Sequence, residues 1–185
     1  MRVLGAVIAG GKSSRMGQDK ALIIWQGKPL IQHVVERLSP QVDGLVVNAN
    51  GARADLAFLG LPVIADMISV GTPLAGLQAI LVYAFEHGFD AVLSAPCDCP
   101  LLPLDLRRRL EGKGAAIASS GGQDHYLTGF WPTSLGRLLV GPALRRVKDF
   151  AAAAHARPVQ WDSAGDDPFL NVNTPEEFQR LSEKP

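Results

Sequence analysis

The sequence predicts an α/β fold, in which a mostly parallel sheet carries helices on both faces. Short apolar runs rich in Val, Ile and Leu alternate along the chain with amphipathic segments, and this alternation is typical of repeated strand–helix–strand units. The apolar runs are nearly free of charged residues, as expected of strands that are buried on both faces of a parallel sheet. The predicted architecture is therefore a Rossmann-like three-layer sandwich.

Residues 1–185 are expected to form one domain. The apolar fraction of 47% is sufficient for one core at this length, and the sequence shows no internal repeat or long linker. Lys plus Arg and Asp plus Glu each number 18, so no net charge attracts nucleic acid or an anionic membrane surface. An anionic ligand must therefore be held by local geometry.

The apolar runs predict the strands, and two long helices fall between them. The expected strands are Leu4–Ile8, Gly44–Val47, Pro62–Ile64, Ala91–Ser94 and Ala115–Ala118. The expected helices are Pro29–Leu38 and Pro73–His87, which both begin with Pro near the first turn, and the second ends at Gly88. Each helix places its large apolar residues on one side, so both are expected to pack on the sheet.

The second half of the chain is less regular. Gly121–Asp124 has the composition of a turn, and His125–Trp131 has the aromatic and β-branched content of a strand, which could run antiparallel. Arg145–Ala156 fits either a helix or an irregular surface stretch. A terminal helix is expected to begin at Thr174, because this hydroxyl residue precedes Pro175 and two acidic residues.

The two cysteines, Cys97 and Cys99, are separated by one residue, so a disulfide between them would be strained. This usage favours a reducing compartment, and the sequence contains neither a signal-like start nor an apolar run of membrane length. A cytoplasmic location is therefore expected. The spacing matches neither a zinc site nor a thioredoxin motif, so both cysteines are expected to be small apolar wall residues.

A glycine loop with three cations follows the first predicted strand. It reads Gly-Gly-Lys-Ser-Ser-Arg-Met-Gly-Gln-Asp-Lys over residues 10–20. Glycines let main-chain N–H groups approach phosphate oxygens, while Lys12, Arg15 and Lys20 can neutralise the charge of a triphosphate. The first crossover is also where α/β sheets bind their ligands. A solvated surface loop is the alternative.

This loop matches neither of the two familiar phosphate-binding motifs. A Walker loop needs a glycine five positions before Gly11, where this chain has Ala6 inside the predicted strand. A dinucleotide fingerprint needs its second glycine at the position of Lys12. The loop therefore predicts phosphate binding of another kind.

Asp98 follows the apolar run Ala91–Ala95 and lies between Pro96 and Pro100. A carboxylate at the end of a parallel strand is expected to face the ligand crevice. Magnesium takes one or two protein carboxylates and completes its shell with phosphate oxygens and water, so a single Asp is sufficient. The alternative is an Asp that only caps a turn.

Other polar residues follow the predicted strands or precede the last helix. Asn48 could contact a base or a sugar, or could simply form a turn. Asp66 ends the third strand and by itself is only a candidate helix cap. Asn171 and Asn173 share a face if their segment is extended. The alternative is that these two residues and Thr174 form one capping element.

Together these motifs resemble the nucleotidyltransferase superfamily, and especially the molybdenum cofactor guanylyltransferases of the MobA family. Six ordered motifs carry the resemblance: Ala9–Gly11 with Arg15–Gly17 and Asp19–Lys20, then Gly27–Leu30, Val46–Asn50, Thr72–Gly76, Pro96–Pro100 and Asn171–Glu176. They extend over most of the chain. The resemblance implies a Mg²⁺-dependent transfer of GMP from GTP to molybdopterin (Mo-molybdopterin), which releases pyrophosphate.

The resemblance also implies roles for individual residues. Those implied to bind nucleotide, metal or acceptor are Ile8, Ala9, Gly10, Gly11, Lys20, Asn48, Asp66, Asp98 and Asn171. Those implied to act in catalysis are Arg15, Lys20, Asp98 and Asn173. Asp98 is the implied magnesium ligand. No protein nucleophile is required, because an acceptor phosphate is already anionic.

The segment at His125 departs from the family pattern, which has His-Pro followed shortly by Leu-Trp. Here it reads His-Tyr-Leu-Thr-Gly-Phe-Trp, so His125 is either an acceptor-side contact or an exposed turn histidine.

Other substrate pairs stay open: CTP with molybdopterin, or a nucleotide with a sugar phosphate. A regulatory module that binds GTP without turnover is also open, although it would not need the acid at position 98. Proteins that build or deliver the molybdenum cofactor are candidate partners.

Overall fold

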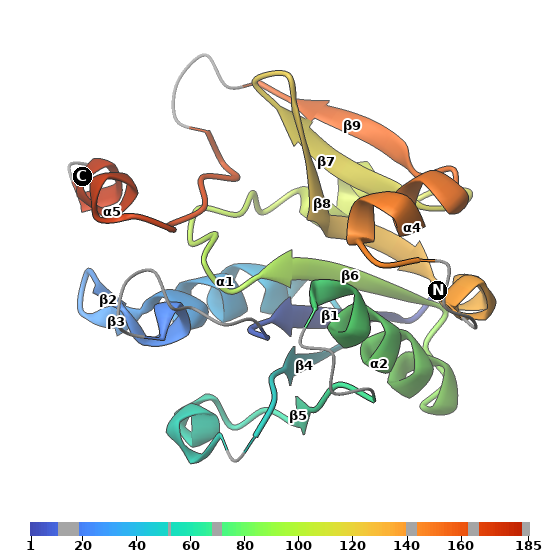
Figure 1. The fold of residues 1–185 in the computed structure, drawn as a ribbon, viewed down its shortest axis with the longest axis horizontal. Helices are drawn as coiled ribbons and strands as arrows, with labels where there is room; N and C mark the ends of the chain where they lie inside the picture. The colour runs from blue at the N-terminus through green and yellow to red at the C-terminus, as the bar shows by residue number, and fades with distance from the viewer. Residues whose placement is uncertain (11–18, 52, 68–71, 140–143, 163–166, 183–185) are drawn as a thin grey trace.

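The computed structural model describes residues 1–10, 19–51, 53–67, 72–139, 144–162 and 167–182. Its centre is a seven-stranded sheet with the order β5-β4-β1-β6-β8-β7-β9 (Figure 1). The strands are β1 (Val3–Ile8), β4 (Gly44–Asn48), β5 (Val63–Ile64), β6 (Ala91–Pro96), β7 (Ala116–Ser120), β8 (Gln123–Pro132) and β9 (Arg157–Trp161). β8 is antiparallel to both of its neighbours, and the other pairings in this sheet are parallel. The predicted mostly parallel sheet is confirmed.

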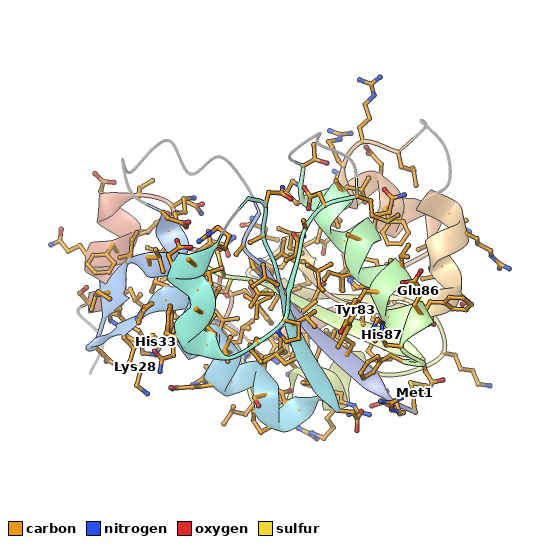
Figure 2. The ribbon with its side chains drawn as sticks, turned by 90° about the horizontal axis from the view of Figure 1, so that it is seen from below. Met1, Lys28, His33, Tyr83, Glu86 and His87 are labelled. Carbon is orange, nitrogen blue, oxygen red and sulfur yellow. The ribbon has the colours of Figure 1, made fainter. Side chains whose placement is uncertain are left out.

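Helices cover both faces of this sheet (Figures 1 and 2). They are α1 (Leu30–Leu38), α2 (Pro73–Glu86), α3 (Leu106–Leu110), α4 (Val147–Ala153) and α5 (Pro175–Ser182). Ile31, Val34 and Leu38 of α1 lie in one core with Leu106 and Leu110 of α3, whereas the large buried side chains of α2 and α4 lie in another. In the described part of the chain, no helix is long and apolar enough to cross a membrane.

The sheet separates these two cores because β1 and β6 are buried along their whole length. β1 contributes Val3 and Val7 to the core under α1, and it contributes Leu4, Ala6 and Ile8 to the core under α2. Successive side chains of a strand point to opposite faces. Continuous apolar strands therefore supply both layers at once, as the sequence predicts.

A third cluster ties the C-terminal helix to the first half of the chain. Leu181 of α5 and Val172 are buried with Trp25 and Leu30, and Trp25 belongs to a short hairpin of β2 (Ile24–Trp25) and β3 (Lys28–Pro29). Val172 N also donates to the carbonyl of Asp98 at 3.0 Å. This packing fixes the segment around Val172 beside the end of β6.

Some boundaries differ from those expected. Gly121 and Gly122 alone form the turn, with φ of 54° and 78°, and β8 begins at Gln123 inside the turn expected over Gly121–Asp124. The segment expected as either a helix or a surface stretch contains a helix, α4, which is shorter than Arg145–Ala156. The strand β9, which begins Arg157-Pro158, was not expected, because a polar strand that contains Pro is tolerated at a sheet edge but carries little strand pattern.

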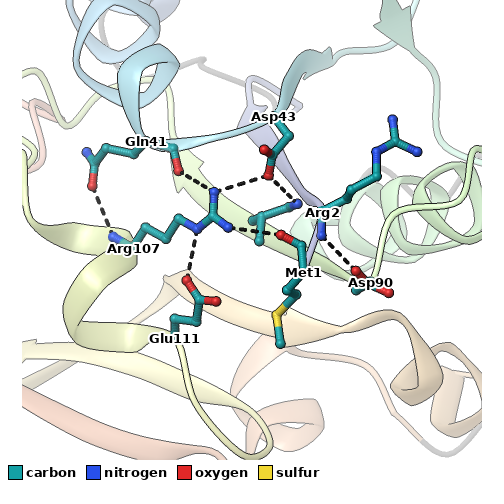
Figure 3. A network of polar contacts seen from close by, with 8 residues as sticks. Met1, Arg2, Gln41, Asp43, Asp90, Arg107 and Glu111 are labelled. Atoms are coloured by element: carbon teal, nitrogen blue, oxygen red, sulfur yellow. Dashed lines mark hydrogen bonds and ion pairs between the residues drawn. The ribbon is translucent and has the colours of Figure 1, made fainter.

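A network of polar contacts centred on Arg107 joins the start of β1 to α3 (Figure 3). Its guanidinium donates to Met1 O at 3.1 Å, to Asp43 Oδ2 at 3.1 Å and to Glu111 Oε2 at 2.9 Å. Asp43 Oδ2 also accepts from Val3 N at 2.8 Å. This backbone hydrogen bond and the nearby Arg107 hold the pKa of Asp43 below its usual range. The start of β1 is thereby joined to α3, at the end of the sheet opposite to the carboxyl ends of the strands.

A buried serine joins β6 to the antiparallel strand β8. Ser94 Oγ accepts from Trp131 Nε1 at 2.9 Å and donates to Leu127 O at 2.7 Å. The side chains of Ser94 and Trp131 are fully buried, so water cannot replace these hydrogen bonds. The serine therefore supplies the polar partner that a buried indole N–H needs.

Ser94→Ala is expected to lower the free energy of unfolding by about 2 kcal/mol, because it leaves a buried indole N–H without a partner. Denaturant unfolding measures the change. Ser134→Ala, at an exposed position, is the matched control and is expected to change stability by less than about 0.5 kcal/mol. A loss at Ser94 no larger than that of the control would contradict this role.

Candidate functional site

The carboxyl ends of β1, β4 and β6 meet at one edge of the sheet, with β1 between the other two. After β1 the chain forms β4 and β5 on one side of it, and then returns to form β6 on the other side. Doubly wound sheets bind ligands in the crevice at the carboxyl ends of the strands where the order reverses in this way. Ala9 N donates to Asn48 O at 2.8 Å, and Cys97 N donates to Ile8 O at 3.1 Å. The chain segments that leave the three strands are thus held together just beyond their ends.

Lys20, Asp98 and Asn173 come together at this edge from three distant parts of the chain. Lys20 Nζ lies 3.8 Å from Asp98 Oδ2 and donates a hydrogen bond to Asn173 Oδ1. The Lys20 and Asp98 side chains are 18% and 14% exposed, so both charges are largely shielded from water. The structure thus brings together three of the four residues that the sequence suggests for catalysis.

The carboxylate of Asp98 lies in a region with few compensating charges. Its burial raises its pKa, Lys20 acts in the opposite direction, and the nearby Glu177 adds to the rise. A shielded carboxylate with one cation at the limit of ion pairing is a site that a further cation would stabilise. A second cation beside Asp98 would therefore be bound favourably.

A divalent cation fits this position. Among the described residues, no group of three or more His, Cys, Asp and Glu side chains could hold a metal by itself. A metal at Asp98 would therefore take its other ligands from phosphate oxygens and water. Mg²⁺ is usually bound in this manner, through one or two carboxylates and the phosphates of a substrate.

Asn48 lies buried on the other side of β1, and its amide orientation is fixed by its partners. Nδ2 donates to Ile64 O at 3.0 Å and to Asp66 Oδ1 at 2.9 Å. Oδ1 is buried and has no partner within the described part of the chain. A Cβ would lie only 2.1 Å from this oxygen at Gly76 and 3.2 Å from it at Gly10. The glycines thus leave room for a buried acceptor at the start of the glycine loop.

Asp66 is held to the loop after β4 rather than to a helix. Its Oδ2 accepts from Asn50 Nδ2 at 2.7 Å, and its own N–H donates to Asn50 Oδ1 at 2.8 Å. Helix α2 is instead capped by Thr72, whose Oγ1 accepts from Ala75 N at 3.3 Å. Asp66 therefore does not serve as the cap of α2. It orders, together with Asn48, the ends of β4 and β5.

Arg53 is a site residue that the sequence analysis missed. Its guanidinium lies 2.7 Å from Asp19 Oδ2 and 2.9 Å from Asp55 Oδ1, and its side chain is 14% exposed. Asp19 Oδ1 also accepts from Ala21 N at 3.0 Å and so caps the 3₁₀ turn that begins at Lys20. The pair anchors this turn to the segment after β4. No local pattern signals the contact between Arg53 and Asp19, because these two residues are far apart in sequence.

The two asparagines before α5 have separate partners, and neither side chain caps the helix. Thr174 Oγ1 accepts from Glu177 N at 3.2 Å, and Glu177 Oε2 accepts from Thr174 N at 2.9 Å. These reciprocal bonds form a capping box. Asn173 contributes only its backbone N–H to Glu177, at 2.6 Å, while its side chain accepts from Lys20. The alternative of one shared capping element therefore holds for Thr174 alone.

Asn171 accepts a hydrogen bond from the thiol of Cys99 through Oδ1. Cys99 is buried, and Cys97 is partly buried. Burial raises the pKa of both thiols far above the ordinary value, so both keep their protons at neutral pH. Both cysteines are therefore protonated thiols on either side of Asp98, and Cys99 also orients Asn171.

His125 and Asn171 line one pocket of about 180 Å³, together with residues 123, 124 and 126–128 of β8. His33 and His87 instead lie on α1 and at the end of α2 (Figure 2), where they hydrogen-bond to Trp25 O and Tyr83 O. Of these three histidines, only His125 lies beside a residue of the candidate site. His125 lies within β8 and is half-buried, so it is not an exposed turn histidine.

The remaining expected residues fall into two groups. Ile8, Ala9 and Gly10 lie where β1 ends, as expected. Gly11 and Arg15 lie outside the described residues, as does Lys12.

The sequence was compared with known families and proteins. Residues 5–159 match the family model of the MobA-like NTP transferase domain. A molybdenum cofactor guanylyltransferase from Cereibacter sphaeroides is 42% identical, over 97% of this chain and 95% of its own length. A protein of the same name from Rhodopseudomonas palustris (strain BisB5) is 42% identical, over 92% of this chain and 88% of its own length.

Solved structures share the fold. The molybdopterin-guanine dinucleotide biosynthesis protein A of Archaeoglobus fulgidus superposes with a TM-score of 0.76, at 20% identity and over 97% of each chain. The protein Rv0371c of Mycobacterium tuberculosis H37Rv superposes with a TM-score of 0.78, at 19% identity, over 99% of this chain and 98% of its own. The sequence matches establish more than the fold: this chain belongs to the MobA-like NTP transferase family, alongside the relatives named molybdenum cofactor guanylyltransferase.

Proposed function

We propose that this protein transfers GMP from GTP to molybdopterin (Mo-molybdopterin) and releases pyrophosphate. The observation that carries the proposal is the meeting of Lys20, Asp98 and Asn173 at the strand ends. This arrangement places an ammonium group, a carboxylate that would bind a metal, and an amide close together. The names of the relatives supply the substrate pair, since they are guanylyltransferases of the molybdenum cofactor.

The nucleotide is assigned to the side of the crevice formed by β1, β4 and β5. Backbone groups of Ile8–Gly10, together with Gly11 and Arg15 of the glycine loop, would bind phosphates through N–H groups and a guanidinium. Asn48 offers a buried acceptor oxygen beside Gly10, which would receive a hydrogen bond from the nucleotide. Asp66 orients that amide through its bond to Nδ2.

Mg²⁺ would be held by Asp98 and would supply positive charge to the phosphate oxygens. Lys20, at 3.8 Å from the same carboxylate, adds a second positive charge and can donate to a phosphate oxygen in place of its hydrogen bond to Asn173. The charge that gathers on the leaving pyrophosphate is thereby offset within a shielded site.

The transfer itself requires no covalent intermediate with the protein. An oxygen of the acceptor phosphate attacks the α-phosphorus of GTP, a new P–O bond forms, and the bond between the α- and β-phosphoryl groups breaks. The nearby thiols remain protonated because of their burial, so they are poor nucleophiles. The protein acts by aligning the two substrates and by balancing charge.

Asp98→Asn is expected to abolish more than 99% of GMP transfer, because it removes the negative charge that would bind the metal while keeping the size of the side chain. Thermal stability should stay the same or rise, since a shielded charge is removed. Mass spectrometry of the guanine dinucleotide product measures the transfer. Asp149→Asn, at an ion pair on the surface of α4, is the control and should retain parental activity. Comparable transfer by the Asp98 variant and the parent would reject the assignment.

Lys20→Met is expected to lower kcat/KM for GTP by about 100-fold, because the shielded site loses its resident cation. Arg15→Ala should lower kcat/KM for GTP by a smaller factor. Steady-state kinetics with varied GTP give both values. Lys28→Met, which removes a half-exposed lysine paired with Glu36, is the control and should leave kcat/KM unchanged. If neither loop variant differs from this control, the glycine loop does not bind the triphosphate.

Asn173→Ala is expected to lower turnover about tenfold while leaving GTP affinity and melting temperature nearly unchanged, because its side chain contacts Lys20 rather than the helix cap. Thr174→Ala should do the opposite, with a stability loss of about 1 kcal/mol and normal turnover. Calorimetry and kinetics on the two variants separate catalysis from capping. A lowered melting temperature with full turnover in Asn173→Ala would assign that residue to structure.

A further inference from the structure

Ser120, His125 and Asp167 form a chain of hydrogen bonds that the proposed reaction does not use. Ser120 Oγ lies 2.7 Å from His125 Nε2, and it donates to Asp167 Oδ1 at 2.8 Å. Ser120 is 1% exposed, and the imidazole packs against Phe169 with ring centroids 4.8 Å apart. Ser120 belongs to β7, His125 to β8, and Asp167 to the segment before α5. Contacts from two other parts of the chain therefore hold this histidine in place.

The direction of these hydrogen bonds determines where His125 carries its proton. A serine hydroxyl has one proton, and Ser120 gives it to the carboxylate of Asp167. Ser120 Oγ can therefore only accept from His125, which requires a proton on Nε2. In a neutral imidazole the other nitrogen, Nδ1, is then an acceptor. Burial lowers the pKa of His125, against the effects of Asp167 and Asp124, and so favours this neutral form.

The pocket beside His125 presents two further polar side chains, those of Thr128 and Asn171. Thr128 is 1% exposed, and its Oγ1 has no partner among the residues that the structure describes. Asn171 uses its Oδ1 to accept from Cys99, which leaves its Nδ2 as a donor. At about 180 Å³, the pocket is below the usual size for a whole ligand and suits one ring system. Its acceptor, hydroxyl and donor match a heterocycle that carries both ring N–H groups and acceptor atoms.

The position of the pocket assigns it to the acceptor rather than to the nucleotide. Asn48 and Asp66, which are assigned to the nucleotide, lie at the ends of β4 and β5, whereas the pocket lies on β8, on the other side of β6. Asp98 follows β6 between them, and its carbonyl accepts from Val172, the neighbour of Asn171. A ring in the pocket therefore belongs to the substrate that approaches Asp98 from the side opposite to GTP.

We propose that Ser120 and Asp167 are positioning residues that hold His125 with its proton on Nε2, so that Nδ1 accepts a hydrogen bond from a ring N–H of the acceptor's pterin. This inference rests on the proposed function, because it takes molybdopterin as the acceptor. His125 then contributes to specificity: a ring without a donor at that position would leave Nδ1 unpaired and would bind more weakly.

The protonation of the ring can be measured without any substrate. In ¹⁵N NMR of the protein labelled at histidine, His125 should give the signals of the neutral form protonated at Nε2 at pH 7.5. Ser120→Ala should reduce the population of this tautomer, because the acceptor for Nε2–H is removed. A parent protein in which His125 carries its proton on Nδ1, or exchanges freely between the two forms, would overturn the positioning role.

Kinetics test the contact with the acceptor. His125→Leu is expected to raise KM for molybdopterin about tenfold, with the loss falling on KM rather than on kcat and with an unchanged Kd for GTP. His125→Asn keeps an acceptor oxygen near the position of Nδ1 and should recover most of this loss. His87→Leu, at the end of α2, is the control for removal of a histidine. Melting temperatures of all variants show whether they are folded.

The outcomes distinguish this inference from the function on which it rests. Transfer to molybdopterin with an unchanged KM in His125→Leu would overturn the inference and leave the proposed function intact. A parent protein that binds GTP but forms no guanine dinucleotide would overturn both.

Discussion

The carboxylate of Asp98 is held out of water at the end of β6, and much of the site follows from the need to balance its charge. Burial raises its pKa, and Lys20 is close enough to oppose that rise without forming a short ion pair. Such an arrangement costs stability unless more positive charge is supplied. A metal bound with a triphosphate would supply it, so the burial that makes this carboxylate costly would favour binding of the metal and the nucleotide.

The order of the strands divides the edge of the sheet around this carboxylate. On one side, β4 and β5 hold the amide of Asn48 between Asp66 and the start of the glycine loop. On the other side, the antiparallel strand β8 carries the pocket that His125 and Asn171 line. Two substrates can thus approach Asp98 from opposite sides, which a reaction between two bound phosphates requires. The hairpin at residues 121–122 reverses the chain into β8 and so creates the second side.

The sequence predicted what depends on periodicity and strand ends, and it missed what depends on distant partners. The buried strands and helices α1 and α2 carry strong patterns, and Asp98 follows directly from one of them. Arg53 and Ser120 could not be found in this way, because their roles arise from partners brought together only by the fold. Strand β9 was missed because an edge strand need not be apolar. Only the geometry excludes a capping role for the side chain of Asn173, because Thr174 and Glu177 form the cap.

The central claim is that this edge of the sheet joins the nucleotide of GTP to molybdopterin. It is tested most directly by offering the purified protein equal concentrations of GTP, CTP, ATP and UTP together with Mg²⁺ and molybdopterin, and by identifying the products by mass spectrometry. The account predicts molybdopterin guanine dinucleotide and an equal amount of pyrophosphate. A product that carries another nucleotide, or GTP that is bound but not consumed, would contradict it.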